Sequence, residues 1–335
     1  MVLIGGYTRL SGSGLSMVDW SVQGNWLPLS SSAWETEFAR YKEYPEFKKT
    51  YAPSGGMSMS EFQRIYFVEW FHRQFGRFTG LFFCVPFLGL TAAGVLQPPL
   101  VRSLGVLGGL GLCQGLVGWW MVQSGLKDDL LVKPDQPRVS PYRMAFHWLM
   151  ALTLVGRCAW LGLAAAPVAA SAAVSSTANL RRALRPVLTF AGLTLASAPF
   201  VAGNDAGRSF NRWPLMTETS MVPDEVWRLF DGPLSFSPAR VFEDSAVVQF
   251  AHRTFAYGTA LSALAFAWHA RLQSGLSARI RTLSTRALPA VALAQLSLGV
   301  ITLLMYVPWE LGLAHQAGGL AVFGTLGYLR FLLRK

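Results

Sequence analysis

Residues 61–80 read EFQRIYFVEWFHRQFGRFTG, and this stretch decides how the rest of the chain can fold. It opens a long apolar run and places Glu69 and His72 three positions apart. Residues at this spacing lie on one face of an α-helix, so both side chains should face the same space near the start of a membrane span. An ionisable group inside an apolar span is costly, which indicates a functional site. The alternative is that both groups are solvated at the membrane surface.

The composition places the chain among helical membrane proteins. Of its 335 residues 52% are hydrophobic and only 14% are charged, too few charges for an ordinary soluble domain of this size. Lipid tolerates only helices or closed barrels, and a helix needs about 20 apolar residues to cross it. Seven segments meet this length: 66–96, 103–125, 142–170, 184–203, 246–269, 286–307 and 310–332. The sequence therefore predicts an all-α polytopic membrane protein.

The net charge of +11 gives the topology of these spans. Removing eleven basic residues from the 29 Lys and Arg leaves 18, equal to the number of acidic residues. The eleven lie in segments without acidic residues: Arg102; Arg181, Arg182 and Arg185; Arg271, Arg279, Arg281 and Arg286; and Arg330, Arg334 and Lys335. Alternating spans put all four segments on one side, which should be the matrix or the cytoplasm. The charge is thus a topology signal, and we expect no nucleic-acid partner.

The cysteines predict no disulfide framework. The chain has an odd number of cysteines, and they show neither Cys-x-x-Cys nor zinc-site spacing: Cys84, Cys113 and Cys158. All three lie in apolar runs, and we interpret them as small core residues.

A weak internal repeat divides the chain into two halves. FVEWFHRQFGR around His72 resembles VVQFAHRTFAY around His252, and VLIGGYTRLSGSG at 2–14 resembles PFVAGNDAGRSFN at 199–211. A full span precedes the second copy but not the first. We expect two pseudo-repeated four-helix bundles, residues 1–175 and 176–335, the first helix lying before residue 1. The alternative is a seven-helix protein.

Four of the five histidines form two matching pairs. His72 and His147 stand near the starts of the first and third spans, and His252 and His315 repeat this arrangement in the fifth and seventh. Two imidazoles that face each other across a bundle are typical axial ligands of a b-type haem. The other reading is four unrelated histidines, each bonded to a neighbouring helix. His269 lies at the inner end of its helix, and we interpret it as interfacial.

Two further features qualify these pairs. One turn after each paired histidine stands a small residue, which would leave room for a macrocycle: Gly76, Ala151, Ala256 and Gly319. Glu69 breaks the symmetry, because Gln249 holds the equivalent position before His252. A carboxylate at one site only is expected if that site does proton-linked chemistry and the other relays electrons.

Segments spread over nearly the whole chain resemble the haem A synthase family in its mitochondrial-type form. They are GGYTRLSGSGLSMVDW, WETEFARYKEYPEFK, MSMSEFQRIYFVEWFHRQFGR, FHWLMALTL, FVAGNDAGRSFN, FAHRTFAYG and AHQAGGLAVFG. The resemblance implies an eight-helix membrane enzyme, an oxidoreductase that converts a ring methyl of haem O into the formyl group of haem A for cytochrome oxidase assembly. The cysteine pairs that some bacterial relatives carry in outer loops are absent here.

The resemblance also implies roles for the site residues. His72 and His147 would face the substrate haem, His252 and His315 would bind the iron of haem b, and Glu69 would be the catalytic carboxylate. It implies the mitochondrial inner membrane, with a bacterial plasma membrane as the alternative. Implied partners are membrane lipid, a ferredoxin-type electron donor, haem O synthase and oxidase assembly factors. A di-haem b-type electron-transfer cytochrome is the alternative function, and a transporter is a third.

The charge distribution makes a testable prediction about topology. Residues 270–285 should face the matrix or cytoplasm and residues 204–245 the opposite side, because the basic segments stay inside. Single cysteines introduced into each loop and labelled with an impermeant reagent from either side would check this. Labelling of 204–245 from the matrix side would contradict the assignment.

Overall fold

The computed structural model describes residues 1–21, 24–126, 138–166, 174–232 and 236–334. Within these residues the chain is helical and contains no β-strand element. It divides into two compact units, Met1–Leu154 and Val155–Lys335. The expected division into bundles at residue 175 stays a prediction.

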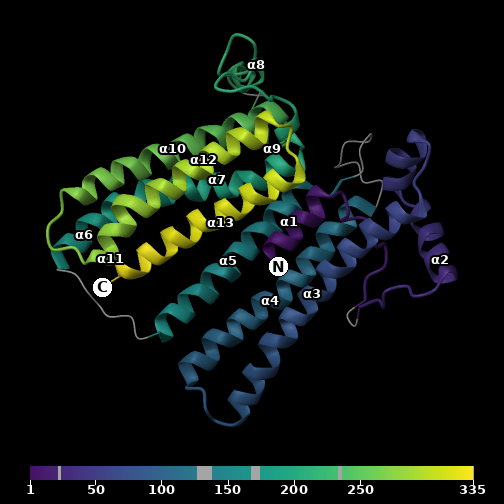
Figure 1. The fold of residues 1–335 in the computed structure, drawn as a ribbon, viewed down its shortest axis with the longest axis horizontal. Helices are drawn as coiled ribbons and strands as arrows, with labels where there is room; N and C mark the ends of the chain where they lie inside the picture. Colours follow the sequence, from purple (N-terminus) through teal and green to yellow (C-terminus); the bar gives the residue numbers. More distant parts are fainter. Residues whose placement is uncertain (22–23, 127–137, 167–173, 233–235, 335) are drawn as a thin grey trace. The chain divides into compact units, whose positions relative to one another are not determined.

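Seven long helices of the described chain occupy the seven segments predicted to span the membrane (Figure 1). They are α3 (Met59–Ala92), α4 (Pro98–Leu126), α5 (Pro141–Ala165), α7 (Arg185–Gly203), α10 (Ser245–Arg271), α12 (Leu288–Leu304) and α13 (Trp309–Leu332). Five stretches are long and apolar enough to cross a membrane: α3, α4, α5, Thr177–Gly203 and Ala278–Leu304. α10 and α13 are long enough, with 27 and 24 residues, but are not among these five. The prediction of an all-α polytopic membrane protein is confirmed.

Short helices connect and flank the long ones. In the first unit they are α1 (Val2–Leu10), α2 (Ser31–Lys42), η1 (Phe47–Tyr51) and η2 (Ala52–Ser54). In the second unit they are α6 (Val174–Ala183), η3 (Ala206–Arg208), α8 (Asp224–Trp227), η4 (Arg228–Phe230), α9 (Pro238–Glu243), α11 (Ala278–Thr282) and η5 (Leu283–Ala287).

α3 begins at Met59, seven residues before the predicted start of its span. Ser58 and Glu61 form a capping box: the Glu61 amide donates to the Ser58 hydroxyl, and the Ser58 amide donates to the Glu61 carboxylate. This pairing satisfies two backbone donors that a helix start leaves open. The helix therefore extends beyond its apolar run into the polar segment before it.

The second unit is a bundle of α7, α10, α12 and α13, in which α10 packs against both α7 and α12. Gly258 of α10 makes this approach possible, since a Cβ there would lie 2.4 Å from the Phe190 ring of α7. The Thr194 and Thr259 hydroxyls are hydrogen-bonded across the same pair of helices at 3.1 Å. The buried core includes Leu184, Val187, Ala263, Phe266, Leu288, Val322 and Leu329.

The cysteines are free, as expected, but their interpretation as core residues is wrong. Cys113 and Cys158 are exposed on α4 and α5. An apolar residue on a membrane helix has lipid as an alternative to the core, so apolar surroundings in the sequence did not imply burial.

An aromatic cluster joins α2 to the start of α3 in the first unit. Phe62 stacks on Phe38 with ring centroids 4.8 Å apart and on Tyr41 at 5.2 Å. Tyr66 meets the edge of Trp34 at 5.2 Å. Such ring pairs contribute roughly 0.5–1.5 kcal/mol each beyond their area burial, so the polar segment before α3 has its own packed core.

Glu46 lies beside this cluster and accepts a 2.8 Å hydrogen bond from the Tyr41 hydroxyl. Burial raises the pKa of Glu46 to about 7; the Tyr41 hydrogen bond opposes this rise, Glu69 adds to it and Arg9 opposes it. A carboxyl whose pKa is raised on folding stabilises the fold below its unfolded pKa of 4.5 and loses that stabilisation as the pH rises through about 7.

We therefore expect Glu46→Gln to remove a pH dependence of stability. The amide still accepts from Tyr41 but cannot ionise, so the variant should match the wild type near pH 4.5 and exceed it near pH 8. Because Glu46 is only half-buried, the gap at pH 8 should stay below about 3 kcal/mol. Unfolding of both proteins in detergent across this pH range measures it. A gap that does not change with pH would show that Glu46 ionises equally in both states.

Candidate functional site

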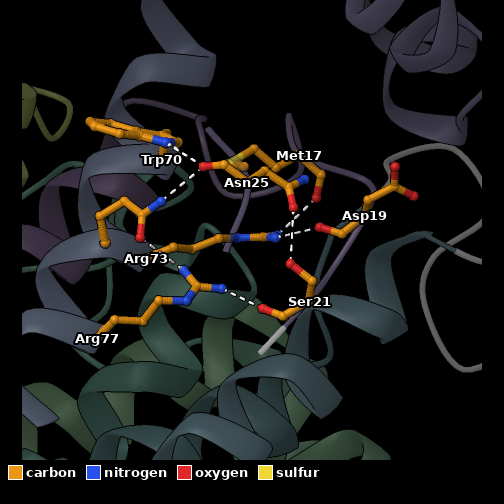
Figure 2. Close-up of a pocket in the computed structure, with 8 residues that line it drawn as sticks. Met17, Asp19, Ser21, Asn25, Trp70, Arg73 and Arg77 are labelled. Carbon is orange, nitrogen blue, oxygen red and sulfur yellow. Dashed lines mark hydrogen bonds between the residues drawn. The ribbon is translucent and has the colours of Figure 1, made fainter. Parts of the chain in front are cut away.

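The loop after α1 is bound to α3 through Glu69 and Arg73, and Figure 2 shows the contacts of Arg73. We call the described residues 11–21 and 24–30 the first loop. The Glu69 carboxylate, only 2% exposed, accepts from the Ser16 hydroxyl and the Met17 amide at 2.8 Å each and from Arg73 at 2.6 Å. Arg73 also donates to the carbonyls of Met17 and Asp19 at 2.8 Å each. The sequence places Glu69 beside His72, but in the structure its oxygens bind this loop.

The binding continues along α3. Arg77 donates to the Ser21 carbonyl at 2.6 Å, and Trp70 and Gln74 both donate to the Asn25 carbonyl at 2.9 Å. These side chains line a small pocket between the loop and the helix, drawn in Figure 2. The polar groups of these side chains form hydrogen bonds with carbonyls of the first loop, so the contacts around the pocket hold the loop against α3.

The second unit repeats this arrangement with one change. Arg253 donates to Gln249 at 2.7 Å and to the carbonyls of Phe210 and Arg212 at 2.6 and 3.0 Å. Gln249 uses its other amide atom to donate to the Ala206 carbonyl at 2.5 Å. We call residues 204–212 the second loop. The first loop offers hydrogen-bond donors, which the Glu69 carboxylate accepts. The second loop offers a carbonyl, to which the Gln249 amide donates. The difference between Glu69 and Gln249 therefore has a local structural cause.

His72 and His147 come together within the first unit, close enough to interact electrostatically. α1 approaches His72 closely, since a Cβ at Gly5 would lie 3.2 Å from its Nε2. α4 holds His147: Gln114 Nε2 lies 3.3 Å from the His147 Nε2 and donates to the His147 carbonyl at 3.1 Å. His147 Nδ1 is buried without a hydrogen-bond partner among the described residues.

His252 and His315 come together in the second unit, with ring centroids 6.5 Å apart and planes 78° apart. His252 Nδ1 is hydrogen-bonded to the Ser197 hydroxyl at 2.8 Å, and His315 Nδ1 lies 3.0 Å from Gln295 Nε2. Both Nδ1 atoms are thus engaged, which leaves Nε2 of each ring to bind a metal.

The second pair fits the two axial ligands of a haem iron. A metal bonded by one nitrogen of each ring at roughly 2 Å would hold the ring centres on the order of 6 Å apart, close to the observed 6.5 Å. The first pair is held less tightly, because His147 Nδ1 has no hydrogen-bond partner among the described residues. The structure brings His252 and His315 together and places His72 near His147, while their roles as haem ligands stay predictions.

Two other expectations have mixed outcomes. Gly76 and Gly319 do not open a gap, because a Cβ there would meet the Met1 methyl at 3.3 Å and the Gln295 amide at 3.6 Å. His269 lies in the last turn of α10, 17 residues along that helix from His252, with Nε2 3.4 Å from the Gln273 amide.

Sequence reasoning missed the residues that hold the second histidine of each pair. Gln114 and Gln295 contact His147 and His315, and four residues later a glycine faces the same ring. A Cβ at Gly118 would lie 3.0 Å from His147 Cε1, and one at Gly299 would lie 2.8 Å from His315 Cε1. Gln-x-x-x-Gly in the span before each of these histidines was the available signal.

Comparison with known proteins identifies relatives over nearly the whole chain. A sequence model of the COX15–CtaA family, described as cytochrome oxidase assembly protein, matches residues 1–326. The chain is 39% identical to the haem A synthase COX15 of Arabidopsis thaliana, over all of this chain and 72% of that protein. It is 39% identical to the haem A synthase of Maricaulis maris, over 96% of this chain and 89% of that protein. No solved structure matches the chain.

The two arginines allow a matched test of how the loops are held. Arg73→Gln leaves the buried Glu69 carboxylate without its cation, a change that costs roughly 3–5 kcal/mol. Arg253→Gln leaves only the neutral Gln249 and two carbonyls, for which about 1–3 kcal/mol is expected. Unfolding in detergent gives both costs, and hydrogen exchange should report local opening of the first loop in Arg73→Gln. Equal losses of unfolding free energy in Arg73→Gln and Arg253→Gln would contradict the importance of the buried Glu69 carboxylate.

Proposed function

Because the chain belongs to the COX15–CtaA family of cytochrome oxidase assembly proteins, we propose that it is a haem A synthase. In this proposal it oxidises a ring methyl of haem O to the formyl group of haem A, as a multi-pass membrane enzyme. The observation that supports it best is the presence of two histidine pairs that differ at one position: a buried carboxylate, Glu69, stands one turn before His72, where Gln249 stands before His252.

The two pairs take different haems in this proposal. His252 and His315 bind haem b, which supplies one-electron transfer when bound. His72 and His147 face haem O, the substrate. Their surroundings support this division, since the second pair has both Nδ1 atoms engaged while His147 Nδ1 has no partner in the described chain. A resident group benefits from fixed ligands, whereas a substrate must enter and leave.

Glu69 is the proposed proton acceptor or shuttle. The methyl is oxidised through an alcohol to a hydrated aldehyde that loses water. Each oxidation inserts one oxygen, either from dioxygen with two electrons and two protons supplied, or from water with two electrons and two protons removed, so both routes need a group that exchanges protons. Glu69 Oε2 accepts hydrogen bonds from the Ser16 hydroxyl and the Met17 amide, which hold the carboxylate against the first loop. The Arg73 ion pair fixes the carboxylate while it does this work.

Location and partners follow from the same proposal. We place the protein in the mitochondrial inner membrane, with a bacterial plasma membrane as the alternative, because relatives come from both plants and bacteria. Membrane lipid surrounds the spans. A ferredoxin-type protein would supply electrons, haem O synthase the substrate, and oxidase assembly factors would receive the product.

The remaining rival is a di-haem b-type electron-transfer cytochrome. It would hold two permanent haems and contain neither haem O nor haem A. Absorbance and mass analysis of the haems extracted from purified protein distinguish the two, and haem b as the sole pigment at both sites would favour the rival.

A conservative substitution tests the carboxylate. Glu69→Gln should keep normal haem b content yet accumulate haem O or a partly oxidised form, because an amide cannot exchange the protons. The contact with Arg73 should be kept, since Gln249 accepts from Arg253 through its amide oxygen. The amide nitrogen introduced by Glu69→Gln would face the donating Ser16 hydroxyl and Met17 amide, so a control for the position of the first loop is needed. Mass analysis of the extracted haems measures the outcome.

Ser16→Ala is the matched control. It removes one hydrogen bond from Glu69 but keeps the carboxylate, at a cost of about 1 kcal/mol, and should still form haem A. Normal haem A formation by Glu69→Gln would make the carboxylate structural. Equal loss in both variants would assign the effect to the position of the first loop.

A further inference from the structure

Gln295 of α12 lies against His315 with one amide atom bonded and the other unbonded. Its Nε2 lies 3.0 Å from His315 Nδ1 and donates to the His315 carbonyl at 2.9 Å. Its Oε1 is buried and has no hydrogen-bond partner among the described residues. A buried acceptor without a partner is destabilising, so the amide is in an unfavourable state here.

When His315 binds iron, its Nδ1 needs a hydrogen-bond acceptor from the Gln295 amide and no longer a donor. A neutral imidazole that binds iron through Nε2 carries its proton on Nδ1, which then needs an acceptor and not a donor. The unbonded Oε1 is such an acceptor, on the same amide. The last torsion of a glutamine side chain is broad and roughly two-fold, so a half-turn exchanges Nε2 and Oε1. This exchange gives up the hydrogen bond from Nε2 to the His315 carbonyl, and the amide must shift so that Oε1 faces Nδ1 and not that carbonyl.

Glycines of α13 and α12 lie against the Gln295 amide and the His315 ring. A Cβ at Gly318 would lie 2.0 Å from Gln295 Oε1, so the amide rests directly on the backbone of α13. One turn further along α12, a Cβ at Gly299 would lie 2.8 Å from His315 Cε1. The ring therefore lies against α12 at two positions, the amide of Gln295 and the bare backbone of Gly299.

We propose that Gln295 is a positioning residue for haem b, and that its Oε1 accepts the Nδ1–H of His315 in the haem-loaded protein. The inference rests on the proposed function, which gives His252 and His315 to haem b. An acceptor at Nδ1 makes the imidazole a stronger donor to iron, favours the ferric state and lowers the reduction potential. Gln295 thus contributes to the potential of haem b and to its retention.

The first unit supplies a natural control. Gln114 donates to the His147 carbonyl as Gln295 does to that of His315, but its amide lies against the ring Nε2 and not Nδ1. Its Oε1 is also buried without a partner among the described residues. In the proposed function this site takes substrate. A change at Gln114 should therefore leave the potential and content of haem b unaltered, although it removes the equivalent amide.

The test is the midpoint potential and absorbance of haem b in the purified full-length protein. Gln295→Glu offers a stronger acceptor and should lower the potential, whereas Gln295→Leu offers none and should raise it and weaken haem retention about 10–100-fold. Gln114→Leu should match the wild type in the midpoint potential and absorbance of haem b. Wild-type potentials in both Gln295 variants, or shifts in the same direction, would overturn the proposal. If Gln295→Leu does not fold, the fall in potential of Gln295→Glu decides.

Two further variants separate this inference from the function beneath it. His315→Met should change the haem b spectrum; an unchanged spectrum would refute the ligand assignment itself. Gly318→Ala favours the helix by about 1 kcal/mol yet displaces the Gln295 amide, so it should shift the potential. Gly324→Ala, where a Cβ meets nothing within 4 Å, should not. A changed His315→Met spectrum with a wild-type potential in Gly318→Ala would refute the role of Gln295 alone.

Discussion

A guanidinium group that is kept from water must find its hydrogen bonds inside the protein, and this requirement organises both halves of the chain. Arg73 and Arg253 each directly follow the first histidine of a pair, and each binds two carbonyls of the loop before its helix. Fixing the arginine fixes the rotation of the helix about its axis. The neighbouring histidine is thereby aimed at its partner, and the loop is held across the end of the bundle.

The two halves solve the same geometric problem with different charge. Glu69 neutralises Arg73 and receives two further donors from the first loop. Arg253 is bound by neutral groups only, among them Gln249. A buried ion pair adds little net stability when it is complete, but it makes removal of either partner costly. The first half therefore carries the stronger constraint on sequence, at the site proposed to bind substrate.

The sequence predicted those features that depend on one segment at a time. Apolar runs located the seven long helices, and the positions of His72, His147, His252 and His315 in them predicted the two pairs. Contacts between distant segments were out of reach: Glu69 lies 53 positions from Ser16, and no local pattern shows that the first loop offers donors.

Burial was also unpredictable where lipid replaces water. Cys113 lies in an apolar run and is exposed, because the lipid-facing side of a membrane helix is as apolar as its core. Gln114 and Gln295 were overlooked for a related reason. A single amide in an apolar span reads as a tolerated polar residue unless the partner that it bonds is known.

The close approach of bare backbone to the imidazoles limits how the protein could be stabilised by engineering. Replacing helical glycine by alanine commonly gains up to about 1 kcal/mol, and this chain has many such positions. At Gly5, Gly118 and Gly299 the added methyl would press on a histidine ring, so a consensus or propensity scan would recommend substitutions that damage the site. Positions such as Gly109 and Gly111, where a methyl meets nothing within 4 Å, are the ones open to thermostabilisation.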